Sequence, residues 1–247
     1  MKLALGVEYL GTEFHGWQLQ KSGIRTVQLV VEEALSTIAD QKIRVHCSGR
    51  TDSGVHAIEQ VIHFETTVKR EEKAWLYGGN VNLPSDVNFL WVKKVEEDFH
   101  ARFNAFARQY RYKIHNTKVR SSLLASRSLW EPRKLNIESM NLAAELLIGE
   151  HDFSSFRGKL CQAKSPVKNI EYINFTKNGS EINLEIKANA FLHHMVRNIV
   201  GTLIKVGREE RDIEWVREVL ESKQRSMAGA TAEPQGLYFV KAFYKDL

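Results

Sequence analysis

The chain has 247 residues, of which 43% are hydrophobic and 26% are charged, as is ordinary for a folded globular protein. No apolar run approaches the roughly 18 residues needed to span a bilayer, and the first residues show no signal-peptide pattern. Two cysteines, Cys47 and Cys161, are too few for a disulfide scaffold or a four-cysteine zinc site. These features exclude disordered, membrane, collagen-like, coiled-coil and disulfide-stapled proteins, and they predict a cytoplasmic location.

Charge is distributed unevenly along the chain. Residues 1–100 contain 11 Lys/Arg and 14 Asp/Glu (net −3), whereas residues 101–247 contain 24 and 16 (net +8). Between Arg102 and Lys134, nine basic residues accompany one acid, Glu131, and several aromatic residues. This mixture suits a nucleic acid, because cations bind phosphates while rings stack on bases. The alternative is an ordinary solvent-exposed strand face.

The first half of the chain predicts six elements. Leu3, Leu5, Val7 and Tyr9 alternate with other residues as in a strand, and Thr26 is a suitable N-cap for the helix that follows it. The predicted elements are a strand over 2–9, a helix over 27–38, strands over 43–47 and 60–66, a helix over 70–77 closed by Gly78 and Gly79, and a strand over 87–95. Their order is β-α-β-β-α-β.

The second half predicts the same order. Asn178-Gly179 is a strong signal for a tight hairpin between two strands. The predicted elements are a strand over 105–116, a helix over 137–148 ended by Gly149, strands over 169–175 and 181–189, helices over 195–207 and 212–220, and a strand over 237–244. We therefore expect an α+β fold of two tandem ferredoxin-like units with mainly antiparallel sheets, 1–103 and 104–247, joined around a central cleft.

Signatures of several common chemistries are missing. The chain contains no dinucleotide-binding GxGxxG, no phosphate-binding P-loop, no HExxH, no CxxC and no GxSxG. His193 and His194 are adjacent, so on a helix their side chains would point about 100° apart, away from a shared metal. We therefore expect neither a metal nor a cofactor.

The loop from Cys47 to Ala57 is unusual in composition. It is rich in small residues and presents Arg50, Asp52 and His56 between two predicted strands. A turn that contains Asp and Gly requires no function, because aspartate readily binds its own following backbone. Three ionisable groups within seven residues nevertheless keep a functional site in view.

The string Gly49-Arg-Thr-Asp-Ser-Gly-Val-His-Ala57, followed by Gln60-Val-Ile-His-Phe64, resembles the signature of the TruA family of tRNA pseudouridine synthases. Other matching blocks extend the resemblance from near residue 8 to near residue 240: Glu8–Gln18, Asn80–Pro84, Phe99–Phe103, Arg108–Tyr112, Gly149–Phe153, Phe191–Gly201, Ala228–Ala232 and Gly236–Phe239. Departures from the family pattern remove no reactive group, and they lie at Leu10, Cys47, Ser48, Ser53 and Ala230.

The resemblance implies a reaction that converts uridine to pseudouridine in RNA without cofactor or metal. It implies that Asp52, in the first domain, is the catalytic carboxylate. A carboxylate can act as a nucleophile, adding to the sugar or the base, or as a base that removes a sugar proton. The residues alone do not choose among these roles.

The resemblance also implies roles for four other side chains. Arg197 would pair with Asp52, and Tyr110 would pack on the target base and assist proton transfer. Arg50 would hold the flipped-out nucleotide geometry, because a guanidinium stacks on bases and binds phosphate. Arg108, on the same strand face as Tyr110, would contribute to RNA binding in the basic second domain.

By resemblance, the target is the anticodon stem-loop of tRNA at positions 38, 39 and 40, and the enzyme is a homodimer whose two subunits both contact RNA. The alternative is a non-catalytic RNA-binding or RNA-folding module of tandem ferredoxin-like units. The aromatic signature strings of RNA-recognition domains are absent, which disfavours that alternative. A third interpretation combines catalysis with RNA folding.

Overall fold

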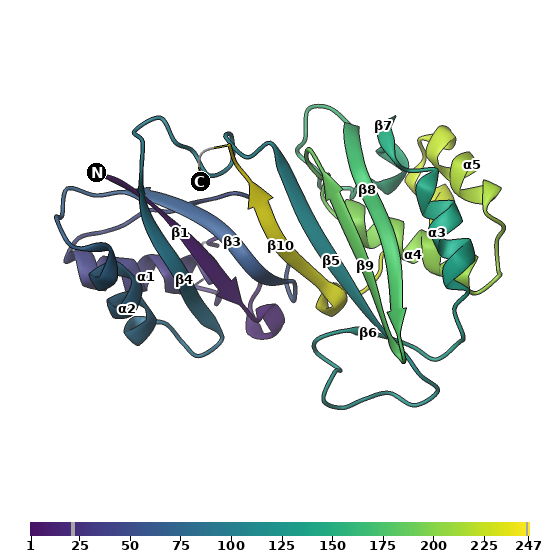
Figure 1. The fold of residues 1–247 in the computed structure, drawn as a ribbon, viewed down its shortest axis with the longest axis horizontal. Helices are drawn as coiled ribbons and strands as arrows, with labels where there is room; N and C mark the ends of the chain where they lie inside the picture. The colour runs from purple at the N-terminus through teal and green to yellow at the C-terminus, as the bar shows by residue number, and fades with distance from the viewer. Residues whose placement is uncertain (21–22, 246) are drawn as a thin grey trace. The chain divides into compact units, whose positions relative to one another are not determined.

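The computed structural model describes residues 1–20, 23–245 and 247, which form ten β-strands and five α-helices in a mixed α+β fold (Figure 1). The chain groups into two compact units: unit 1 contains residues 1–106 and 238–247, and unit 2 contains residues 107–237. The sequence-based division at residue 103 places the last strand in the second domain, whereas in the structure the chain returns to unit 1 at Tyr238.

Unit 1 is built on an antiparallel sheet with one parallel addition. Strand β1 (Lys2–Tyr9) lies between β4 (Val87–Val95) and β3 (His56–Glu65), antiparallel to both. The other edge of β3 pairs with β2 (His46–Cys47) near one end and, in parallel, with β10 (Leu237–Phe243) near the other.

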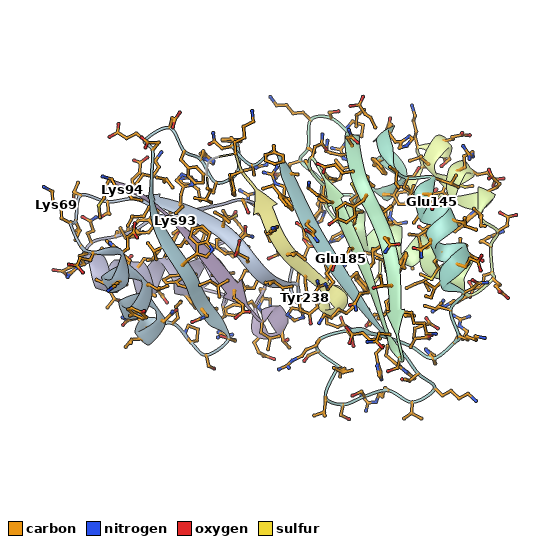
Figure 2. All side chains as sticks on the ribbon, in the orientation of Figure 1. Lys69, Lys93, Lys94, Glu145, Glu185 and Tyr238 are labelled. Atoms are coloured by element: carbon orange, nitrogen blue, oxygen red, sulfur yellow. The ribbon has the colours of Figure 1, made fainter. Side chains whose placement is uncertain are left out.

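The parallel pairing explains why the last strand groups with unit 1. Tyr238 and Phe239 of β10 pair with His56 and Ala57 of β3. The Phe239 side chain is fully buried. The ring of Tyr238, a residue labelled in Figure 2, has its centroid 4.6 Å from that of His56. Sequence alternation predicts that β10 is a strand, but it does not indicate that the strand pairs with β3.

Two helices lie together against unit 1's sheet, α1 (Val27–Ala39) and α2 (Glu72–Asn82) (Figure 1). Helix α1 starts as predicted, with the Leu29 backbone N–H donating to Thr26 Oγ1 at 3.4 Å. The prediction that Gly78 and Gly79 end the second helix is wrong, because α2 continues through both to Asn82. A Cβ on Gly79 would lie 2.4 Å from the Phe89 ring, so this glycine permits close helix–strand packing.

Within unit 2 four strands pair antiparallel, in the order β5 (Ala107–Asn116), β9 (Glu181–Ala188), β8 (Val167–Asn178) and β7 (Gly149–Asp152). The predicted hairpin is confirmed, because β8 and β9 pair up to Asn178↔Glu181. Strands β7 and β6 (Leu129–Glu131, parallel to β5) were not predicted, since four and three residues are too few to show alternation.

Three helices belong to unit 2: α3 (Ile137–Glu145), α4 (Met195–Gly207) and α5 (Glu214–Ser222). All three were predicted, with ends shifted by no more than three residues. Every second residue of β9 is buried, from Ile182 to Ala188, as a strand with one face in the core requires. None of the helices among the described residues is long and apolar enough to cross a membrane.

Candidate active site

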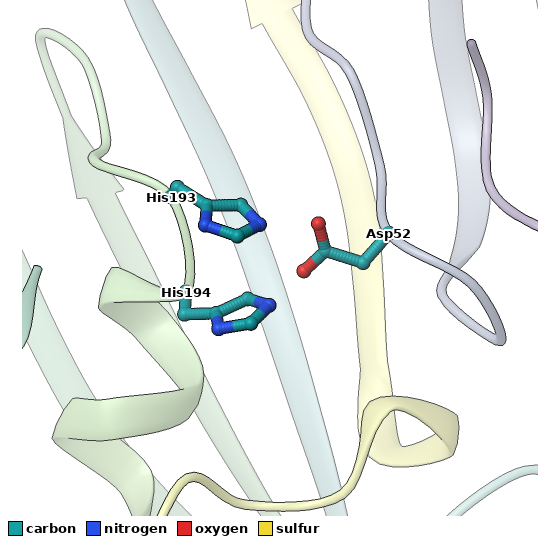
Figure 3. Close-up of side chains that lie close together, drawn as sticks. All are labelled: Asp52, His193 and His194. Carbon is teal, nitrogen blue, oxygen red and sulfur yellow. The ribbon is translucent and has the colours of Figure 1, made fainter. Parts of the chain in front are cut away.

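Asp52 lies on a short loop of unit 1 between β2 and β3 (Figure 3). Its side chain is half-buried, and its backbone carbonyl accepts a hydrogen bond from the Val55 N–H at 3.2 Å, which closes a tight turn. The loop leaves the sheet at Ser48, whose N–H donates to the Val61 carbonyl at 2.8 Å. The carboxylate is therefore carried by a short turn that starts and ends on paired strands.

A second loop of unit 1, residues 11–17, packs on the Asp52 loop. The Trp17 N–H donates to the Thr51 carbonyl at 3.0 Å, and the Phe14 carbonyl accepts from the Gly54 N–H at 3.3 Å. Gly16 has φ +82°, and a Cβ there would lie 2.8 Å from the Thr51 carbonyl oxygen. The two backbones are in direct contact, which fixes residues on both sides of Asp52.

Arg50 and His56, the other ionisable groups of this loop, differ in their surroundings. Arg50 is exposed. His56 is 1% exposed, and its Nδ1 accepts the Gly11 N–H at 2.9 Å. That acceptor role requires an unprotonated Nδ1, and the hydrogen bond joins His56 to the 11–17 loop. Burial raises the pKa of the nearby Cys47 to about 12, although the positive charges of Arg50 and Arg102 act in the opposite direction. The raised pKa keeps this thiol protonated.

Unit 2 carries the predicted strand residues. Arg108, Tyr110 and Tyr112 share one face of β5, as predicted. Tyr110 is half-buried, and its ring meets Phe191 edge-on with centroids 5.0 Å apart. The Arg108 Nη1 donates to the Asn189 carbonyl at 3.1 Å. Tyr110 is therefore held by an aromatic neighbour that sequence reasoning included in a motif but gave no role.

Arg197 is the third residue of α4. Its Nε donates to the Ala232 carbonyl at 2.7 Å, and the Ala232 N–H donates to the Arg197 carbonyl at 3.1 Å. Tyr112 is fully buried, and its hydroxyl donates to the adjacent Glu233 carbonyl at 2.6 Å. Burial raises the pKa of Tyr112, Arg197 opposes this shift and Glu233 adds to it. The segment at residues 232–233 thus brings Arg197 and Tyr112 together within unit 2.

His193 and His194 do not lie on a helix. His194 has φ +62° and precedes the first residue of α4, so the expected 100° separation of the two side chains is wrong. Their rings instead stack with centroids 3.8 Å apart and planes 27° from parallel (Figure 3). The helical geometry failed because the chain turns just before Met195, a turn that residue spacing does not indicate.

Sequence reasoning missed the residues that support the Asp52 loop. Gln60 of β3 is fully buried and hydrogen-bonds to Ser48 and Gly49, and the Tyr9 hydroxyl lies 2.7 Å from Thr51 Oγ1. The available signal was a polar residue in a run of buried strand positions: Gln60 precedes Val61 and Ile62, both at most 1% exposed.

The family model described as tRNA pseudouridine synthase matches residues 6–104 and 143–245. These ranges include Arg50, Asp52 and Arg197, whereas Arg108 and Tyr110 fall between them. Similar proteins named "tRNA pseudouridine synthase A" come from Hydrogenovibrio crunogenus (53% identical, 99% of this chain, 93% of the relative), Nitrosococcus oceani (50%, 100%, 95%) and Pseudomonas aeruginosa (49%, 98%, 85%).

Proposed function

The chain belongs to the tRNA pseudouridine synthase family, and we propose on that premise that it isomerises uridine to pseudouridine in tRNA. The observation that carries the proposal is 53% identity to a protein named for this activity, over 99% of the chain. In the reaction, the bond from C1′ to N1 of uracil breaks and a bond from C1′ to C5 forms. The proton on C5 is lost to water and N1 gains one, so nothing is oxidised or reduced.

We propose that Asp52 is the reacting carboxylate. Its support is local: the turn from Asp52 to Val55 and the contact with residues 11–17 hold the side chain on a fixed backbone. A preorganised carboxylate suits either addition to the substrate or removal of a sugar proton. Asp52→Asn keeps the shape of the side chain but removes both capacities, so we expect turnover to be abolished while tRNA binding stays within a few fold.

We propose that Arg197 assists Asp52 and that Tyr110 covers the target base. The hydrogen bond from Nε to Ala232 orients the Arg197 guanidinium, and a guanidinium pairs with a carboxylate through two parallel hydrogen bonds. The Tyr110 ring is oriented by Phe191, which suits stacking on uracil. Arg50, exposed on the Asp52 loop, would hold the extruded nucleotide, and Arg108 would contact the RNA backbone.

We propose that the target is the anticodon stem-loop, at positions 38, 39 and 40, and that the enzyme works in the cytoplasm as a homodimer. The excess of basic residues in 101–247 supports recognition through the RNA backbone. Light scattering of the purified enzyme tests the dimer, and a monomeric mass at working concentration would contradict it.

The proposed activity is tested by mapping modified sites. An unmodified tRNA transcript with uridines at positions 38–40 is incubated with the enzyme, treated with a carbodiimide that marks pseudouridine, and read by primer extension. We expect stops at the uridines of this stem-loop. Binding of the transcript without any modified uridine would instead favour the non-catalytic RNA-binding module.

A further inference from the structure

Gln60 holds the start of the Asp52 loop by both ends of its amide. Its Nε2 donates to the Gly49 carbonyl at 2.5 Å, while its Oε1 accepts from the Gly49 N–H at 3.3 Å. The Ser48 hydroxyl also donates to Oε1, at 2.5 Å. One side chain therefore satisfies both backbone groups of Gly49, three residues before Asp52.

The setting of this amide makes its hydrogen bonds specific. Gln60 is 0% exposed on β3, and Ser48 is 2% exposed. Removing the partners of a buried amide costs more free energy than the hydrogen bonds contribute to stability, because the unpaired polar groups cannot bond to water instead. The Gly49 backbone is thus confined to one position relative to β3.

The residue next to Asp52 is held in a similar way. The Thr51 Oγ1 lies 2.7 Å from the Tyr9 hydroxyl, and both side chains are buried. The Thr51 carbonyl accepts the Trp17 N–H at 3.0 Å. Residues 48, 49 and 51 are therefore fixed by side chains or backbone of β1, β3 and the 11–17 loop, and Arg50 and Asp52 project from this fixed frame.

We propose that Gln60 is a positioning residue for catalysis: it sets the position of the Asp52 carboxylate through Gly49. The proposal rests on the proposed function of Asp52. A displacement of about 1 Å in a reacting group costs on the order of 100-fold in rate, even where substrate binding is unchanged. A residue that only supported the fold would instead change stability and leave the rate of the folded enzyme unaltered.

The chain offers a matched control for the two hydrogen bonds between the Gln60 amide and the Gly49 backbone. Asn80 of α2, also in unit 1, accepts the Phe89 N–H at 2.7 Å through Oδ1 and donates to the Phe89 carbonyl at 3.0 Å. It makes the same two-bond contact with one residue, on β4 and not on the Asp52 loop. Asn80→Leu therefore reports how the loss of two such hydrogen bonds, away from the Asp52 loop, affects unit 1.

The test compares Gln60→Met with Asn80→Leu in single-turnover tritium release from tRNA labelled at uridine C5, with enzyme in excess. Thermal unfolding and tRNA Kd are measured on the same samples. For Gln60→Met we expect a rate about 100-fold below wild type, with Kd within threefold. For Asn80→Leu we expect a rate within threefold of wild type and a lowered Tm. A folded Gln60→Met enzyme with near-wild-type rate would overturn the proposal.

Gln60→Glu is the second variant that tests the positioning role, for the case in which Gln60→Met does not fold. A neutral carboxyl has the shape of the amide and donates to the Gly49 carbonyl, whereas a carboxylate repels it, and burial favours the neutral form. The rate of Gln60→Glu relative to wild type should rise at least fivefold from about pH 8 to pH 6, and an unchanged ratio would count against positioning. Wild-type enzyme without activity, or fully active Asp52→Asn, would instead contradict the proposed function.

Discussion

His63 of β3 is a buried titratable group of unit 1. This imidazole is 3% exposed, and its Nδ1 accepts the Ala101 N–H at 3.1 Å. The rings of His46 and His100 lie 5.1 and 4.6 Å away. Burial lowers the pKa of His63 to about 4, with His100, His46 and Lys2 adding to the shift and Glu65 opposing it.

The sign and size of the effect follow from that shift. A folded-state pKa below the ordinary 6.5 means that the unfolded chain binds the proton more readily, so stability is present above pH 6.5 and is lost as pH falls toward 4. Between pH 7 and about pH 4.5, this one group should remove about 2 kcal/mol from the free energy of unfolding. Protonation also turns Nδ1 from an acceptor into a donor that faces the Ala101 N–H.

His63→Asn isolates this contribution, because an Asn carbonyl oxygen can accept the Ala101 N–H but does not titrate. Urea unfolding of wild type and His63→Asn is measured across this pH range, and only the difference in pH dependence is compared. We expect the wild type to lose about 2 kcal/mol more than the variant on acidification. Parallel pH profiles of the two proteins would refute the role of His63.

Three further predictions concern charged groups. Arg197→Ala should lower turnover at least about 100-fold, about 2.7 kcal/mol in the barrier, with little change in tRNA Kd; a near-wild-type rate in steady-state assays would exclude its role. Glu131 is 1% exposed and receives a hydrogen bond from Arg208 Nε at 3.1 Å. Glu131→Gln should therefore lower the free energy of unfolding by about 3 kcal/mol in urea titrations. A change below about 1 kcal/mol would contradict this prediction. Affinity for tRNA should fall steeply with salt, because each phosphate contact contributes about 0.7–0.9 to the slope of log affinity against log salt concentration. Alanine substitutions of basic residues in 102–134 should flatten that slope. Identical slopes for wild type and variants would disprove the contact of these residues with phosphate.

Local patterns predicted most of the elements, because each signal acts within one element. The alternation in β1, the Thr26 cap of α1 and the Asn178-Gly179 turn each depend on residues a few positions apart. The close packing of α2 at Gly79 involves Phe89, ten positions later in the chain, and the pairing of β10 involves β3, far earlier in the chain. Such long-range contacts leave no periodic trace in either segment.

The site shows the same limit. Asp52 and Tyr110 were proposed as site residues from strings that resemble a family signature, and the face that Tyr110 shares with Arg108 followed from the strand period. The hydrogen bonds between Gln60 and Gly49 join residues eleven positions apart in the sequence, and they form only when β2 and β3 pair. The stacking of His193 on His194 depends on the left-handed conformation of His194, which is uncommon for a residue other than glycine.

Release of tritium from tRNA labelled at uridine C5 measures the isomerisation itself, because C5 must exchange its hydrogen for the bond to C1′. Wild type and Asp52→Asn are compared under single-turnover conditions with the same unmodified transcript. We predict one tritium released per modified uridine for wild type and none above background for Asp52→Asn, with similar tRNA binding by both. Release by Asp52→Asn at the wild-type rate, or none by the wild type, would contradict Asp52-dependent pseudouridine formation.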